Sequence, residues 1–356
     1  MRVQFKHRRR IFTISSSTTS VSLSLVVAAI LLFDTVACPA QGIYMREGFE
    51  KPNLAQWALS PCYRPENSIT RSPPPNSGEF SARLEVWPLG KAQSRQEPLV
   101  DGVSCLDADR PSLRFVADGT ERAEIWVPAA RRLPVDTDLW YGFSMLIDGM
   151  VKDDEPRLVI GQWKQSIGKS PIVAQRFKNK TFAITAEQDG PNGLVCRILV
   201  AYQHGRAKPQ EDSFVHGNPR VEASASTCMN DTEVVQRDET RGPAATLPDP
   251  FAGDCWVDMI YHLRASSEED GKLRPDGVLE VWANGAPIAV LRGRIGYYSA
   301  DPTKRNIFFK FGPYRDAGTG RDYTTTVYFD SFTRGSSYSE VDPAHFFGRD
   351  LVALCR

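Results

Sequence analysis

The chain has 356 residues, and its 43 Lys and Arg residues balance its 43 Asp and Glu residues. This zero net charge excludes a global field that draws the protein to nucleic acid or to a membrane surface. A preference for an anionic partner therefore requires a local basic patch. The length fits one large domain better than a small module.

The N-terminal residues have the pattern of a signal peptide. A basic stretch within the first ten residues precedes an apolar run from Val21 to Phe33, which is too short to span a bilayer. Small residues at positions 35–40 allow cleavage. We therefore predict a signal peptide over residues 1–40, a single domain over residues 41–356 and a secreted or periplasmic protein. The alternatives are an uncleaved anchor and a lipoprotein acylated at Cys38, where a loose lipobox ends.

The cysteine pattern after this leader indicates disulfide bonds. An even number of cysteines in an exported chain favours disulfides, and the wide spacing without a Cys-x-x-Cys pair argues against a zinc site. Six cysteines allow 15 pairings, and among these a bond between Cys62 and Cys105 is favoured, because both flank the first expected strands. The cysteines concerned are Cys62, Cys105, Cys196, Cys228, Cys255 and Cys355.

From Gly48 onwards, short alternating segments are separated by turn residues, and no long stretch has helical periodicity. A region rich in Pro, Asp, Glu, Ser and Thr over residues 205–253 is expected to be a long excursion between strands. We predict an all-β fold, a β-jelly roll of two stacked antiparallel sheets with a concave substrate cleft. Strands are expected at residues 80–86, 113–115, 121–127, 140–147, 157–165, 181–187, 194–202, 256–264, 278–282, 308–311 and 326–332, with a turn at Asn284-Gly285.

The segment from Asn306 to Asp316 has one apolar face and one polar face when it is read as a strand. Period two puts Ile307, Phe309 and Phe311 on one side. The other side carries Phe308, Lys310, Gly312 and Tyr314. An ammonium and a phenol on the same side can act on an anionic substrate, and Gly312 is expected to leave room for a bulky ligand.

Two further strands carry polar side chains in the same way. Arg122, Glu124 and Trp126 share one face of residues 121–127. This combination suits a sugar-binding surface, because the indole stacks on pyranose rings and the guanidinium pairs with carboxylates. Gln162 and Lys164 share a face of the strand at 157–165. The alternative for each strand is a solvated face with a cross-strand ion pair.

Other strands offer candidates with less context. Arg83 and Glu85 share a face of an early strand, and His262 shares a face of a late strand with Arg264. A histidine is a candidate proton carrier, and His204 at the end of another strand has the same potential. An ordinary surface position is the alternative for both histidines.

Taken together, these motifs resemble those of the jelly-roll polysaccharide lyases, the group that holds alginate lyases, glucuronan lyases and heparin lyase I. The resemblance points to the heparin lyase I and glucuronan lyase branch and covers residues from about 49 to 332. The motifs that carry it are Arg122-Ala123-Glu124, Gln162-Trp163-Lys164 and Lys310-Phe311-Gly312-Pro313-Tyr314.

The resemblance implies cleavage of a uronic-acid polysaccharide, glucuronan-like or heparin-like, by β-elimination. In this reaction a base removes the proton at C5, donors offset the charge of the neighbouring carboxylate, and an acid protonates the departing O4. The implied catalytic residues are Tyr314 as acid and in one alternative also base, Lys310 as its cationic neighbour or a substrate ligand, and Gln162 and Arg122 at the carboxylate. The implied substrate-binding residues are Glu124, which orients Arg122, together with Trp126, Lys164, Arg83, His262 and Arg315.

One position departs from the resemblance. Many relatives carry a histidine two residues after the glutamine, where this chain has Lys164. The alternatives are that Tyr314 acts alone, that Lys164 serves in neutralisation, or that His204 or His262 reaches in from another strand.

Other functions are open at this point. A lectin-like carbohydrate-binding protein or a structural extracellular domain has the same fold and does not need Tyr314. A laminarinase-type hydrolase is disfavoured, because neither carboxylate spacing of that type, Glu-x-Asp-x-x-Glu or Glu-x-Asp-x-Glu, occurs in the chain.

We expect a monomer whose partner is an anionic polysaccharide, with no nucleic acid and no membrane partner unless Cys38 is lipidated. No cofactor is expected to be required, a structural calcium ion is an open option, and the balanced charge favours a simple polyuronate over a densely sulfated polymer.

Overall fold

The residues described by the computed structural model all lie within one compact unit, Gly42–Arg356. The predicted signal peptide, His204 and Cys62 lie outside these residues. None of the described helices has the length and apolarity that a membrane crossing requires. The described ranges are 44–51, 54–59, 69–71, 76–86, 99–100, 103–106, 114–117, 120–149, 158–166, 169–178, 181–190, 195–203, 215–216, 233–235, 247–248, 255–316 and 323–346.

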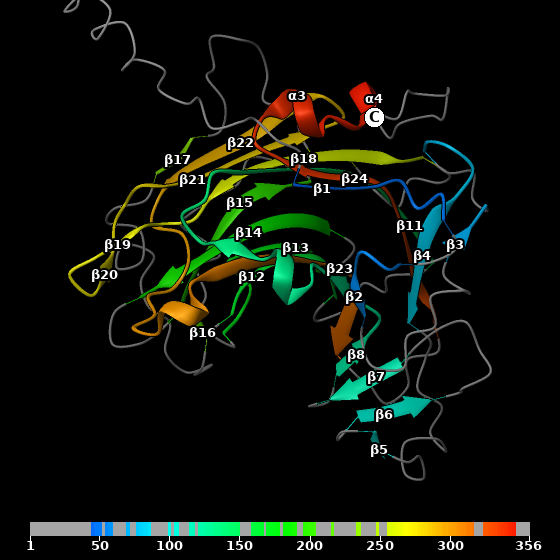
Figure 1. Ribbon diagram of the computed structural model, residues 1–356, viewed down its shortest axis with the longest axis horizontal. Coiled ribbons are helices and arrows are strands. Elements are labelled where there is room, and N and C mark those ends of the chain that lie inside the picture. Colours follow the sequence, from blue (N-terminus) through cyan, green and yellow to red (C-terminus); the bar gives the residue numbers. More distant parts are fainter. Residues whose placement is uncertain are drawn as a thin grey trace, which may run out of the picture. The chain divides into compact units, whose positions relative to one another are not determined.

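Two large antiparallel sheets account for most of the described strands (Figure 1). The first sheet has the order β17 (Glu233–Val235), β22 (Ala286–Gly293), β21 (Gly277–Ala283), β18 (Val257–Arg264), β11 (Leu139–Gly149), β24 (Thr325–Gly335), β4 (Ser81–Val86) and β3 (Ile69–Thr70), and β1 (Met45–Glu47) also pairs with β24.

The second sheet has the order β16 (Val215–His216), β15 (Val195–Tyr202), β14 (Thr181–Asp189), β13 (Val173–Lys178), β12 (Leu158–Gln165), β23 (Asn306–Asp316), β8 (Thr120–Arg122), β7 (Arg114–Ala117), β6 (Val103–Leu106) and β5 (Leu99–Val100). Beside this path, β10 (Leu133–Pro134) and β9 (Ile125–Trp126) pair with β23, and β2 (Ala58–Leu59) pairs with β9. A small hairpin joins β19 (Glu268–Glu269) to β20 (Lys272–Leu273).

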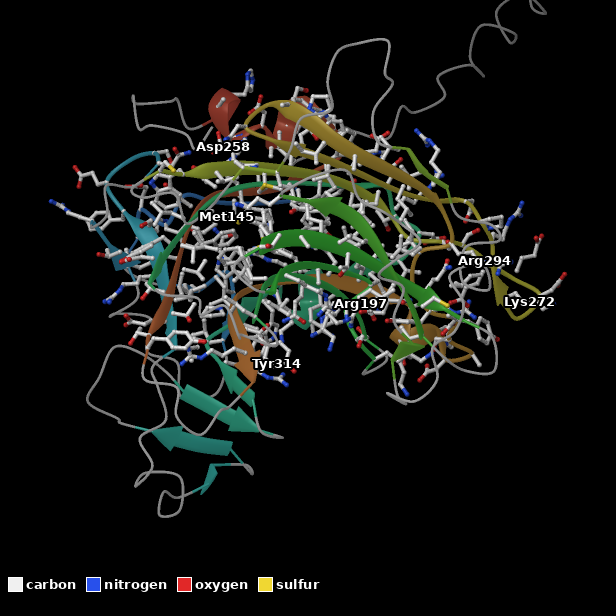
Figure 2. The ribbon with its side chains drawn as sticks, turned by 180° about the vertical axis from the view of Figure 1, so that it is seen from behind. Met145, Arg197, Asp258, Lys272, Arg294 and Tyr314 are labelled. Carbon is white, nitrogen blue, oxygen red and sulfur yellow. The ribbon has the colours of Figure 1, made fainter. Side chains whose placement is uncertain are left out.

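Aromatic rings from both sheets meet between them. Phe311 of β23 stacks on Phe329 of β24 with 3.8 Å between ring centroids, and Phe143 of β11 lies 5.3 Å from Phe309 of β23. All four rings are fully buried, so the apolar face predicted for residues 306–316 packs into the core. In Figure 2, Met145 lies between the two sheets. The prediction of an all-β fold with two stacked antiparallel sheets is confirmed.

The expected strands occur with small changes of boundary. The segment at 121–127 is interrupted between β8 and β9, and the Asn284-Gly285 turn has the two positive φ angles, 50° and 77°, of a tight hairpin. Helical structure is limited, among the described residues, to α3 (Tyr338–Val341), α4 (Pro343–Phe346) and the 3-10 turns η2 (Ala129–Arg131) and η5 (Pro302–Lys304).

The chain bulges at Gly312 of β23, next to the interruption between β8 and β9. Its φ of +125° is a conformation that residues with side chains rarely adopt, and a Cβ there would lie 2.0 Å from the carbonyl oxygen of Ala123. The expectation that Gly312 leaves room for a ligand is therefore wrong. The neighbouring backbone fills that space, which lets Ala123 donate to the Pro313 carbonyl at 2.9 Å.

The structure describes the side chains of two cysteines that were expected to form disulfide bonds. Cys196 in β15 and Cys255 before β18 are buried, and both are disulfide-bonded. The pairing of Cys62 with Cys105 stays a prediction, because Cys62 lies outside the described residues.

Candidate active site

Strand β23 brings the three sequence motifs together. On one side it pairs with β12, where Gln162 lies opposite Lys310. On its other side Trp126 of β9 also lies opposite Lys310, and Arg122 of β8 lies opposite Tyr314. Directly opposed residues project from the same face of a sheet. The face that points away from the core, here called the site face, therefore carries Arg122, Glu124, Trp126, Gln162, Lys164, Lys310 and Tyr314.

Glu124 lies at the centre of this group. Its side chain is almost fully buried and accepts hydrogen bonds from Gln162 Nε2 at 2.6 Å and from Lys310 Nζ at 2.7 Å. Lys310 Nζ also lies 5.3 Å from the centre of the Trp126 ring. These two bonds make Glu124 a residue that positions Gln162 and Lys310, and its expected role in orienting Arg122 stays a prediction. A buried carboxylate with two donors, one of them cationic, is a stable arrangement.

Arg122 and Tyr314 form a second contact on the site face. The Arg122 guanidinium carbon lies 4.2 Å from the centre of the Tyr314 ring, and both side chains are half-buried. The cation is attracted by the electron-rich face of the ring, which fixes the direction of the phenol. In Figure 2, Tyr314 lies on the side of the second sheet opposite to Met145.

Lys164 completes the group from β12, two residues after Gln162. It is half-buried and makes no hydrogen bond or ion pair within the described part of the chain. Burial, and after it the like charge of Lys310, lowers the pKa of Lys164 to about 8.

A second polar cluster extends the site face across β13, β14 and β15. The buried Glu187 accepts hydrogen bonds from Arg176 at 3.0 Å, from Arg197 at 2.7 Å and from the hydroxyl of Tyr297. Burial and the Glu187 charge hold the pKa of Tyr297 well above its usual range, so the hydroxyl keeps its proton. In Figure 2, Arg197 lies on the same side of the second sheet as Tyr314.

Arg176, Glu187 and Arg197 were not predicted as site residues from the sequence. They occupy alternating polar positions of strands β13 to β15, the same period-two signal that selected Gln162 and Lys164. No motif marked them, and only the pairing of the strands shows that their face is continuous with the site face.

A family model described as polysaccharide lyase matches residues 75–333 of the chain. The chain belongs to the polysaccharide lyase family. The predicted family and the predicted enzyme class, a lyase that acts on polysaccharides, are therefore confirmed. No curated protein matches the chain in sequence.

Solved structures with similar folds include polysaccharide lyases. An endo-β-1,4-glucuronan lyase from the fungus Trichoderma reesei has 13% identity and a TM-score of 0.46, covering 85% of this chain and 94% of its own. An alginate lyase from Pseudomonas aeruginosa has 12% identity and a TM-score of 0.36, covering 80% of this chain and 99% of its own. The binding domain of a botulinum neurotoxin, solved with rat synaptotagmin II, has 8% identity and a TM-score of 0.32, covering 81% of this chain and 43% of its own. At such identities the likeness concerns the fold alone.

Two residues predicted to bind substrate lie on the other sheet of this polysaccharide lyase. Arg83 in β4 pairs with Glu85 at 2.7 Å on the outer face of the first sheet. His262 in β18 lies on the same outer face, where its ring stacks on Trp140 with 4.3 Å between centroids. The site face is the outer face of the second sheet, so neither residue belongs to it.

Arg315 is a further correction. It follows Tyr314 but projects towards the core and is fully buried. Its guanidinium donates to the Thr325 hydroxyl at 3.0 Å and to the Tyr323 carbonyl at 3.1 Å, and it lies 4.7 Å from the Tyr323 ring centre. Because its side chain is fully buried, a substrate cannot reach it, so the prediction that Arg315 binds substrate is wrong.

A structural calcium ion stays an open option. Within the described ranges, no three His, Cys, Asp or Glu side chains gather in a way that would hold a metal ion.

Proposed function

We propose that this polysaccharide lyase cleaves a uronic-acid polysaccharide, glucuronan-like or heparin-like, by β-elimination with Tyr314 as the acid. The observation that carries the proposal is the site face itself. It gathers a phenol, an amide, several cations and an indole around one buried carboxylate, although the residues come from distant parts of the chain.

The cationic groups are suited to offset the charge of a uronate carboxylate. An ammonium has three N–H donors, and Lys310 uses one of them for Glu124. The amide of Gln162 likewise has a second N–H beyond the one that Glu124 accepts. Donors fixed before the substrate binds stabilise the negative charge that develops when the C5 proton leaves. Glu124 is thus a positioning residue for both donors.

Tyr314 and Trp126 have the chemistry for the remaining tasks. In the proposal the Tyr314 hydroxyl gives its proton to O4 as the C4–O4 bond breaks, while Arg122 holds the ring in place. Trp126 supplies an apolar surface for a pyranose ring beside Lys310.

The test is Tyr314→Phe, assayed by the ultraviolet absorbance of the unsaturated uronate formed from glucuronan, heparin, heparan sulfate or alginate. We expect the wild type to give this signal on at least one polymer. We expect Tyr314→Phe to lower kcat by about 10²–10⁴-fold and to leave polymer binding in place, because only the proton transfer is lost.

His262→Gln serves as the matched control, since it changes a proton carrier on the other sheet. It should keep the activity of the wild type. Near-wild-type turnover by Tyr314→Phe would show that Tyr314 is not the acid. Binding of a polyuronate without any unsaturated product would instead favour a lectin-like protein, and new reducing ends without that product would indicate a hydrolase.

The expected location is consistent with this substrate class. A polymer too large to enter the cell requires an exported enzyme, and the predicted signal peptide over residues 1–40 supplies the export signal. The monomeric state and the lack of a required cofactor are part of the same proposal.

A further inference from the structure

Lys164 is a cation of the site face whose charge has no partner among the described residues. It lies on β12, two residues from Gln162 and opposite Phe308 of β23. It is half-buried, yet no described residue gives it a hydrogen bond or an ion pair. A buried ammonium without a counter-ion is costly, and loss of its proton relieves that cost.

The two carboxylates whose charges act on Lys164 are already occupied. Both oxygens of Glu124 accept hydrogen bonds, one from Gln162 and the other from Lys310. Both oxygens of Glu187 are also engaged, by Arg176, Arg197 and Tyr297. Neither carboxylate therefore secures the proton on Lys164, although each favours the charged form through space.

Several elements near Lys164 carry further cations. Lys310 on β23 and Arg122 on β8 both lower the pKa of Lys164, and each has a smaller effect than burial. Arg176 lies on the neighbouring β13, and Arg132 lies 3.9 Å over the ring of Phe308, the residue opposite Lys164. Glu124 and Glu187 oppose this trend, because their negative charges favour the protonated form of Lys164.

Arg122 connects Lys164 to the proposed acid. Its guanidinium lies over the Tyr314 ring, and its charge also acts on Lys164. Lys164 and Tyr314 lie on the same face of the sheet, with the Gln162–Lys310 pair at the register position between them.

We propose that Lys164 is the general base of the elimination and that Tyr314 is needed only as the acid. This inference rests on the proposed function.

The proton balance of the step is complete without a further reagent. The neutral Nζ of Lys164 takes the proton from C5, and the C–H electron pair forms the C4=C5 double bond as the C4–O4 bond breaks. O4 takes the proton of the Tyr314 hydroxyl. The ammonium of Lys164 and the phenolate of Tyr314 then exchange one proton through solvent, which restores both groups for the next turnover.

The experiment compares three variants on the polymer that the wild type cleaves, with kcat/KM measured as a function of pH. Lys164→Arg keeps the positive charge but does not lose its proton, so we expect a loss of at least about 100-fold. Lys164→Met, which tests the same point should the arginine not fit, should lose as much. Lys164→His should retain activity. The limb on which kcat/KM increases with pH should move from near pH 8 to lower pH, since free imidazole titrates near about 6.5.

A readout independent of turnover is the NMR titration of the lysine ε-carbons. We expect one resonance that titrates near pH 8, that is absent from Lys164→Arg, and that titrates at higher pH in Lys310→Met, where a like charge has been removed. Activity of Lys164→Arg within a few-fold of the wild type, with an unchanged pH profile, would show that the residue supplies only charge and would overturn the inference. In that case the proposed lyase function would still stand. A wild type that forms no unsaturated uronate from any polymer would overturn both.

Discussion

The buried pair of Glu124 and Lys310 provides the sharpest test of how the site is held together. Their side chains are 2% and 12% exposed, and the ammonium lies 2.7 Å from the carboxylate. Glu124→Gln removes the charge and replaces one acceptor oxygen by an amide that donates. Either Lys310 or Gln162 then faces a second donor, so one of them loses its partner.

The expected loss follows from the burial of the pair. Breaking a buried ion pair by removal of one partner costs about 3–5 kcal/mol of the free energy of unfolding. We expect about 3 kcal/mol, the low end, because the glutamine keeps one acceptor and the Trp126 ring still faces the ammonium. The measurement is urea unfolding followed by tryptophan fluorescence, with the m-value compared to show that the two-state description holds.

Glu79→Gln is the matched control. Glu79 pairs with Arg71 at 2.9 Å, a similar distance, but both side chains are 69% exposed. An exposed pair contributes less than about 1 kcal/mol, so this variant should unfold close to the wild type. In a Lys310→Met background, Glu124→Gln should also cost little, because the stranded ammonium is gone. If Glu124→Gln alone costs no more than Glu79→Gln, the buried pair does not stabilise the site as described.

Two further predictions concern the framework of the sheets. Burial raises the pKa of Asp330 to about 8, so the folded protein binds a proton there that the unfolded chain releases near pH 4. The contribution of this group to stability is present below pH 4 and is lost as the pH rises through about 8. Asp330→Asn should therefore flatten the fall in unfolding free energy between pH 4 and pH 8, measured by urea unfolding at several pH values; a slope equal to that of the wild type would contradict the assignment. Gly312→Ala should unfold at a clearly lower urea concentration than Gly285→Ala. Both glycines have positive φ, but an added Cβ meets the Ala123 carbonyl at 2.0 Å in the first and nothing within 4 Å in the second. Equal midpoints would show that the close contact of β23 is not required.

Much of the fold followed from local pattern. Alternation in segments such as 139–147 and 257–264 reports which side chains face a core, because successive residues of a strand point to opposite faces. The Asn284-Gly285 turn could be predicted for the same reason, since these residues tolerate positive φ. Strands β13 and β22 were not predicted, although the Asn284-Gly285 turn lies directly before β22.

The errors in the predicted site have a common physical cause. Arg83 and His262 have the right residue types on polar strand faces, but sheet membership depends on pairing with distant strands. Arg315 was selected for its charge, whereas its place in the alternation beside Tyr314 turns it inward, where carbonyl and hydroxyl oxygens satisfy the guanidinium.

The sequence by itself determined which residues share a strand face, namely Arg122 with Glu124 and Trp126, Gln162 with Lys164, and Lys310 with Tyr314, because that pattern is set within each strand. Only the tertiary structure decided that these faces join, since Glu124 and Lys310 are 186 residues apart in the chain. It also decided that no carboxylate in the described part of the chain pairs with Lys164. Glu124 and Glu187 are engaged by other donors, and burial together with the charge of Lys310 lowers the pKa of Lys164.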